Sequence, residues 1–479
     1  MTATQRHRRG DCRQPFRARR PARRIARHRR GCGSAGCFGS SRARRPCSKA
    51  KGLKPSAETL AKVIELRKNV KDDARRRTPA TISERWPRRS SCPRSIAPVY
   101  IDEVVARFSH SVTTERPFLE RLTQFWTNHF AVSVDKVAVL GLAGAMEREA
   151  IRPRVTGTSS DLLLAVEKHP AMLLYLDNPA SIGPNSQAAR FVGKRGNGRK
   201  VGINENLARE ILELHTLGVD GGYTQADVTT FAAGDFRMVD RRPGQWPQAR
   251  EAGRRQRHAR RIPVSRSLPR ARRQEGAGQE LWRRRRLRQG EAILRDLAMR
   301  RETARHISTK LARHFIADDP PKAAVDRITH AWLDSKAHLP TVYEALVESP
   351  EAWEQPLAKF KTPADYIYSS YRALGIPLRE KRRALQPFEA LGQRNLMPGS
   401  PAGWPDASAD WDGSSALLKR IAWADVVAQR MGDARNARDL APQLLGATLT
   451  DDTAKAIARA ESGAQALTLL MASPEFMRR

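Results

Sequence analysis

The sequence contains no run of about eighteen apolar residues, the length that a membrane-spanning helix needs, so no transmembrane segment is expected. Basic residues at the N-terminus are not followed by an apolar stretch. No signal peptide is therefore recognisable, and a cytoplasmic location is the default expectation. Aromatic residues make up only 6% of the chain, whereas alanine and leucine are abundant, and this composition favours a helical protein.

Cysteine is scarce as well. The five cysteines among 479 residues all lie within residues 1–50 and 75–97, at Cys12, Cys32, Cys37, Cys47 and Cys92. No two of them form a C-x₂-C pair and no histidine cluster accompanies them, so a zinc finger is not expected. The sequence establishes no metal site, and it leaves any cofactor unknown.

Acidic residues are few in three blocks, 1–50, 75–97 and 236–290. Together these hold 41 of the 87 Lys and Arg residues but only 6 of the 50 acidic residues, and so supply nearly all of the net charge of +37. The blocks contain almost no lysine, no aromatic platform and no helical spacing of their arginines. Such segments are not typical of nucleic-acid-binding arms, so a nucleic-acid partner is not predicted despite the charge.

We interpret the three blocks as segments read in a wrong frame of a GC-rich gene, in which arginine, alanine and proline codons dominate. Shifting the frame over Met238 and Val239 forces a tryptophan codon, and residues 233–239 then permit Arg-Gly-Ile-Ser-Gly-Trp. The same frame over residues 269–273 permits His-Glu-Pro-Gly. The predicted organisation is a basic segment at 1–50, helical parts at 51–235 and 291–479, and a second basic segment at 236–290.

Outside the blocks, apolar residues recur at helical spacing. Thr224 and Asp227 fit the start of a helix, and Gly218 fits the end of one. No segment is a good strand candidate. The predicted fold class is all-α, a multi-helix array with long irregular loops at 169–204 and 393–413. Helices are expected at about 55–74, 99–132, 136–151, 159–168, 204–217, from 224, 290–298, 301–316, 321–335, 339–348, 351–359, 363–374, 414–431, 438–445, 451–460 and 463–471.

Three segments are unusually polar for helical core sequence: 125–130 (FWTNHF), 169–186, with its Asp177-Asn178 pair, and 204–218 (NENLAREILELHTLG). On an α-helix Asn206, Glu210 and Glu213 share one face. These carboxylates could hold a cation or act as an acid and a base. Alternatively, Arg209 and Glu213 form a buried polar network that only stabilises packing.

Other polar residues of these segments also have two interpretations. His129 is either a catalytic residue or a buried core histidine, and His215 either caps its helix or binds a metal. A further group of residues either lines a polar pocket or forms Asx turns that shape a loop. This group consists of Asp177, Asn178, Asn204 and Asn206, with Asn185 and Ser186.

These elements resemble the bacterial domain of unknown function 1800 family. The resemblance rests on Trp-x-Asn-His-Phe, Leu-Asp-Asn with Gly-Pro-Asn-Ser, the helix 204–218, the Tyr-Thr-x-x-Asp-Val element at 223–228 and Pro-Ala-Gly-Trp-Pro at 401–405. It covers roughly 98–235 and 290–479, and the strings recovered from the shifted frame agree with it. The family implies no established activity.

We therefore hypothesise a polar Asn/Glu/His site for a metal or a small polar ligand, which includes a metal-assisted hydrolase. The candidate catalytic residues are His129, Glu210 and Glu213, and the candidate ligand-binding residues are Asp177, Asn178, Asn204 and Asn206. The alternative is a non-enzymatic scaffold or assembly protein in which the same residues stabilise helix packing. A basic nucleic-acid binder is the remote third hypothesis.

Overall fold

A computed structural model describes residues 52–76, 91–178, 204–233, 279–354, 357–378 and 381–479. The predicted basic segment 1–50 and most of 75–97 and 236–290 lie outside these residues, so neither the frame interpretation nor nucleic-acid binding is tested. The described residues form helices and no named strand, which confirms the all-α class. Two isolated bridges, Thr158 with His338 and Phe360 with Arg478, are their sole β pairings. None of the described helices is both long enough and apolar enough to cross a membrane.

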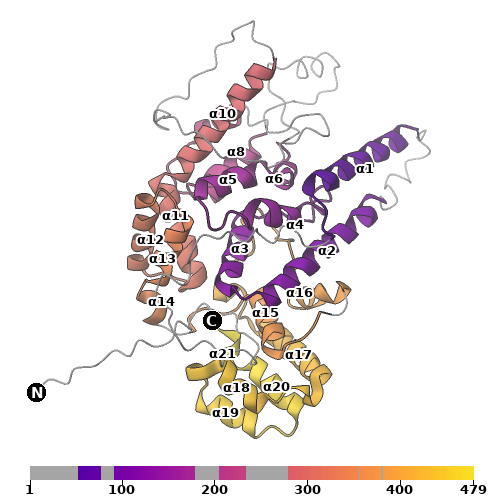
Figure 1. Cartoon of the computed structure of the whole chain (residues 1–479), viewed down its shortest axis with the longest axis vertical. Coiled ribbons are helices and arrows are strands. Elements are labelled where there is room, and N and C mark those ends of the chain that lie inside the picture. Colours follow the sequence, from indigo (N-terminus) through magenta and orange to yellow (C-terminus); the bar gives the residue numbers. More distant parts are fainter. Residues whose placement is uncertain (1–51, 77–90, 179–203, 234–278, 355–356, 379–380) are drawn as a thin grey trace, which may run out of the picture.

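Figure 1 shows the described helices, with α10–α14 along one side of the molecule and α17–α21 at its lower end. The longer ones are α1 (Ser56–Arg76), α2 (Ser91–Thr113), α3 (Pro117–His129), α5 (Ser159–Glu167), α9 (Gln225–Ala233), α10 (Gln279–Ala298), α11 (Arg301–Phe315), α12 (Lys322–Asp334), α13 (Leu339–Val347), α15 (Pro363–Leu374), α17 (Ser414–Met431), α18 (Ala437–Leu445), α19 (Asp451–Ala458) and α20 (Gly463–Ala472). The shorter ones are α4 (Ala143–Met146), α6 (Pro170–Tyr175), α8 (Asn206–Glu210), α14 (Glu351–Glu354), α16 (Gln386–Ala390) and α21 (Pro474–Met477).

Local signals explain several helix ends. Thr224 and Asp227 form a reciprocal capping box before α9, in which each side chain accepts the other residue's backbone N–H. Thr362 caps α15, Pro363 occupies its first turn, and Gly375 ends it in the left-handed conformation at φ 65°. The predicted helix 99–132 is instead two helices, because Pro117 starts α3.

Other parts of the sequence also differ from expectation: the helix predicted at 136–151 begins only at Ala143. The loop predicted at 169–204 contains the short helix α6, which begins when His169 accepts the N–H of Ala171. The helix predicted at 204–217 is α-helical only over Asn206–Glu210 and becomes the π-helix η6 at Ile211–His215. A second π-helix, η4, covers Glu147–Ile151. The wider turn of a π-helix changes which residues share a face, so the face predicted from α-helical spacing does not extend through Glu213.

The buried apolar residues form two main cores. The first core joins α3, α5, η6 and α10–α13, and includes Trp126, Leu162, Leu311 and Tyr343. It contains residues from both sides of the basic segment 236–290. Trp126 Nε1 donates to the Tyr343 hydroxyl at 2.7 Å across it. The second core lies mainly among α15–α21 in the lower part of Figure 1.

Helix α2 connects the two cores. Its Phe108 lies in the second core and makes edge-on contacts with Tyr368 and Tyr371 of α15. Arg372 of α15 donates to the carbonyl oxygens of Ser111, Val112 and Thr114, where α2 ends. A buried cation thereby satisfies carbonyls that a helix end leaves without partners.

Candidate functional site

Asn128, in the last turn of α3, binds the loop 401–405 through its side chain. Its Nδ2 donates to the Trp404 carbonyl oxygen and its Oδ1 accepts the Trp404 N–H, both at 2.8 Å. Gly403 has φ +89°, and a Cβ added there would lie 2.3 Å from the Asn128 carbonyl oxygen. Two elements that are far apart in the sequence, Trp-x-Asn-His-Phe and Pro-Ala-Gly-Trp-Pro, are therefore in contact.

Asp406 follows this loop and pairs with His314, which lies in the last turn of α11. The His314 Nδ1 is 2.9 Å and 2.8 Å from the two carboxylate oxygens. Burial raises the pKa of Asp406, but the charges of His314, Lys359 and Arg121 outweigh it and hold that pKa below its usual range. An ionised carboxylate can only accept, so His314 Nδ1 carries a proton and donates it to Asp406, and in the neutral form of the ring the lone pair then lies on Nε2.

Lys310 lies one turn before His314 on α11. Burial lowers the pKa of Lys310 to about 8, although the Asp406 charge acts against this shift. The helix end therefore presents, beside the imidazole, an amine whose pKa is lowered toward neutral pH.

An open cavity that encloses about 90 Å³ lies beside the pair. His314, Asp406 and Asn128 line it together with Arg107 and Thr362. Apolar wall residues come from both cores: Val132, Met146 and Leu396 from the first, and Phe388 from the second. Ligand sites are commonly found at such junctions, where apolar walls surround a few polar groups.

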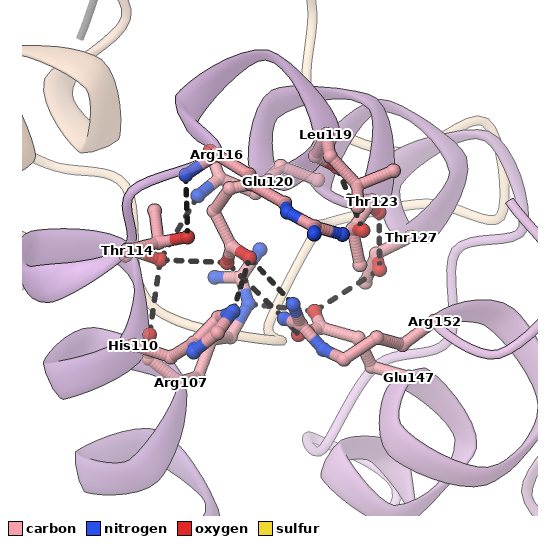
Figure 2. A network of polar contacts seen from close by, with 12 residues as sticks. Arg107, His110, Thr114, Arg116, Leu119, Glu120, Thr123, Thr127, Glu147 and Arg152 are labelled. Atoms are coloured by element: carbon pink, nitrogen blue, oxygen red, sulfur yellow. Dashed lines mark hydrogen bonds and ion pairs between the residues drawn. The ribbon is translucent and has the colours of Figure 1, made fainter. Parts of the chain in front are cut away.

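A buried ionic network lies behind the cavity and joins α2, α3 and η4 (Figure 2). Glu147 Oε2 accepts from Arg107 Nε at 2.7 Å and from the Thr127 hydroxyl at 3.0 Å. Arg152 bridges the two carboxylates, donating to Glu147 Oε1 at 2.8 Å and pairing with Glu120. Figure 2 shows His110 pointing at Glu120 from the side opposite Arg152.

The cations of this network stabilise the charged form of its carboxylates. Burial raises the pKa values of Glu120 and Glu147, but hydrogen bonds and charges from His110, Arg107 and Arg152 hold both below the usual range. Glu147 is the first residue of the π-helix η4. Both carboxylates are thus ionised and fully engaged, which fits a stabilising role better than acid catalysis.

His129 lies in a second buried polar cluster, with His215, His306 and Glu167. Its Nε2 is 3.3 Å from the His215 carbonyl oxygen, and His215 Nδ1 is 2.8 Å from Glu167 Oε1. Burial, followed by the charge of Lys310, lowers the pKa of His129 well below its ordinary value of 6.5. Burial likewise lowers the pKa of His306 to about 4. Both rings are therefore neutral at pH 7.

The structure brings together three of the predicted ligand-binding residues. Asn204 Nδ2 donates to the carbonyl oxygens of Leu176 and Asp177 at 3.0 and 3.1 Å, and its Oδ1 accepts the Asn206 N–H. Asp177 has φ 54° and its exposed carboxylate pairs with Lys136 at 2.6 Å. Asn178 is buried. The Asx-turn geometry accounts for Asn204, while Asn185 and Ser186 lie outside the described residues.

Glu210 and Glu213 are partly buried on α8 and η6. Burial raises the pKa of Glu210, and the Glu213 carboxylate adds to the shift while His215 opposes it. Arg209 pairs with Glu205 at 3.4 Å rather than forming the predicted pair with Glu213. Within the described part of the chain, no group of three or more His, Cys, Asp or Glu residues is placed to hold a metal ion.

Sequence reasoning missed His314, Asp406 and the pair Glu120 and Glu147. Asp406 directly follows the Pro-Ala-Gly-Trp-Pro element. That element therefore marks the loop, but it does not indicate which residue pairs with Asp406. No local pattern identifies His314, because its partner lies 92 residues away.

Comparison with known proteins gives one result. The family described as "Protein of unknown function (DUF1800)" matches residues 37–478. No curated protein and no solved structure matches the chain significantly.

Proposed function

The chain belongs to the DUF1800 family of proteins of unknown function, and we propose that it binds a small polar ligand in the cavity between its two cores, with His314 and Asp406 as an acid–base pair. The observation that carries this proposal is the 2.8 Å contact of His314 Nδ1 with Asp406 at the cavity wall. A carboxylate that fixes the imidazole tautomer leaves Nε2 as a general base.

Several features of the pair fit this role. The side chain of His314 is 14% exposed and that of Asp406 23%, so both are shielded yet reachable from the cavity. Two contacts fix the backbone beside Asp406: Asn128 holds Trp404, and Lys359 Nζ donates to the Asp406 carbonyl oxygen at 2.6 Å. Preorganised geometry of this kind is what proton transfer requires. Hydrolysis of an ester by activated water is the reaction type that these residues support.

The test uses p-nitrophenyl acetate and p-nitrophenyl phosphate as probes. We expect wild-type protein to hydrolyse at least one of them, and H314Q and D406N to lose about a hundredfold or more of the rate. The control H330Q changes an exposed histidine of α12 and should keep the wild-type rate. Wild-type protein inert toward both probes, or H314Q at wild-type rate, contradicts the hydrolytic role.

The polar site predicted around Glu210 and Glu213 is a separate proposal, for a metal or a polar ligand. Two pKa shifts support it. Burial raises the pKa of Glu210, and burial together with the Glu213 carboxylate raises the pKa of Tyr223. Calorimetric titration with Mg²⁺ or Zn²⁺ tests it. Binding that E210Q abolishes and E65Q, on the exposed face of α1, retains would support the site, whereas equal binding by both variants would reject it.

The alternative function, a non-enzymatic scaffold or assembly protein, is supported by the buried ionic network of Figure 2. A scaffold predicts that E210A unfolds the protein. A functional acid predicts that E210A leaves the free energy of unfolding unchanged or raises it.

A further inference from the structure

Arg121 of α3 is a buried cation that has no hydrogen-bond or ion-pair partner among the described residues. Six lysine and arginine side chains in the described residues are less than 9% exposed: Arg121, Lys359, Lys361, Arg372, Arg420 and Arg479. The other five each donate to a carbonyl or carboxylate oxygen. Arg121, 7% exposed, forms no hydrogen bond or ion pair with the described residues, and its Nε and Nη2 are both fully enclosed.

Leaving this charge unpaired is unfavourable. Burial lowers the pKa of Arg121, and the carboxylates of Asp365 and Asp406 only partly offset the effect. The guanidinium carbon lies 5.1 Å from the centre of the Phe315 ring, a weak contact compared with an ion pair. An uncompensated buried charge is a cost to folding that a purely structural arginine would avoid.

Arg121 lines a second, smaller cavity with Lys361 and Arg479. The carboxylates at its wall are already engaged: Glu120 pairs with Arg152, and Asp365 pairs with Arg479 at 2.7 Å. The small cavity therefore has an excess of positive charge. Gln124 lines the same wall; its Nε2 donates one N–H to the Ser111 hydroxyl, and an amide nitrogen carries two.

The small cavity adjoins the large one. Gln124 and Asp365 line both. The Arg121 charge also acts on Asp406, whose pKa it helps to lower. A ligand in the large cavity could thus extend a charged end toward Arg121 while its remainder faces His314.

We propose that Arg121 binds an oxyanion, a carboxylate or a phosphate, and that this group is the charged end of the ligand of the proposed site. Arginine suits this task because its planar guanidinium can donate two parallel hydrogen bonds to such a group. The anion site stands on the Arg121 environment alone. Its assignment to the substrate rests on the proposed function.

The experiment compares wild-type protein with R121M, R121K and the control R116M, whose arginine is exposed just before α3. Phosphate, sulfate and acetate serve as probes, with calorimetry and thermal unfolding as readouts. We expect saturable binding to wild type and R116M, at least tenfold weaker binding to R121K, and none to R121M. Preference for phosphate or for acetate identifies the ligand's charged group.

R121M should also unfold at or above the wild-type temperature without anion, since it removes an unpaired buried charge and keeps an apolar side chain. Equal anion binding by R121M and wild type, or no binding by wild type, overturns the site. If R121M does not fold, undiminished binding by R121K overturns it. H314Q should bind anions like wild type, so loss of hydrolysis in H314Q and loss of anion binding in R121M are separable outcomes.

Discussion

The Asn128 side chain makes two hydrogen bonds of 2.8 Å to the backbone of a single residue, Trp404. The pairing ties the end of α3 to the loop that carries Asp406, so this amide is one of the contacts that position the cavity wall. Aspartate at position 128 would not reproduce this pairing: a carboxylate accepts from the Trp404 N–H but repels the Trp404 carbonyl oxygen.

The first prediction follows from this contact. N128A should lower the free energy of unfolding by roughly 1–3 kcal/mol, because it leaves the partly buried Trp404 groups without their partners. Hydrolysis, if observed, should fall as well, since Asp406 loses its support. Urea unfolding and the p-nitrophenyl assay measure the two effects. N128D should be no better than N128A, and a fully stable N128D would contradict the interpretation.

Gly403 gives a second, sharper prediction. Its φ of +89° is unfavourable for any residue with a Cβ, and that Cβ would meet the Asn128 carbonyl at 2.3 Å. We expect G403A to lower the free energy of unfolding by about 1–3 kcal/mol. The matched control is G399A, where no atom lies within 4 Å and φ is not positive, so its effect should stay within about 0.5 kcal/mol. Equal effects of the two variants would count against the close approach.

Sequence periodicity predicted most helices because their signals are local. The helix expected at 414–431 is α17, with the same first and last residues. Thr450 and Ser462 are the N-cap residues of α19 and α20, and threonine and serine are favoured at that position. The prediction of one continuous α-helix at 204–217 was wrong. It assumed an α-helical repeat throughout, whereas a π-helix begins at Ile211. No sequence rule available for this chain places a π-helix.

The candidate site was harder to predict because its chemistry is non-local. The sequence marked the two elements that contain Asn128 and Trp404 as candidate functional segments. Within the element that contains Asn128, however, the predicted functional side chain was that of the neighbouring His129. In the structure His129 is enclosed by aromatic rings and neutral, whereas Asn128 makes the contact. Which residue of a polar segment faces a distant partner depends on packing that spacing alone does not determine. The catalytic and binding roles of His129, Glu210 and Glu213 stay predictions.

A third prediction concerns the ionic network. E147A should lower the free energy of unfolding by roughly 3–5 kcal/mol, because it leaves two buried arginines, Arg107 and Arg152, without their shared carboxylate. Chemical denaturation measures the loss, and E65A on the exposed face of α1 is the control. Stability of E147A close to that of wild type would show that the network contributes little.

The fourth prediction is a pH dependence that arises from His306. Its folded pKa is about 4, lowered first by burial, against an ordinary value of 6.5 in the unfolded chain. A histidine with a lowered folded pKa binds its proton preferentially in the unfolded state, so it destabilises the fold once the pH drops below 6.5. This loss should grow as the pH falls from 6.5 to about 4 and then level off. H306Q can still donate to the Leu214 carbonyl, so it should show a shallower decline in this window. Urea unfolding at pH 7, 6, 5 and 4 checks this, with H330Q as the exposed control, and parallel curves for H306Q and wild type would refute it.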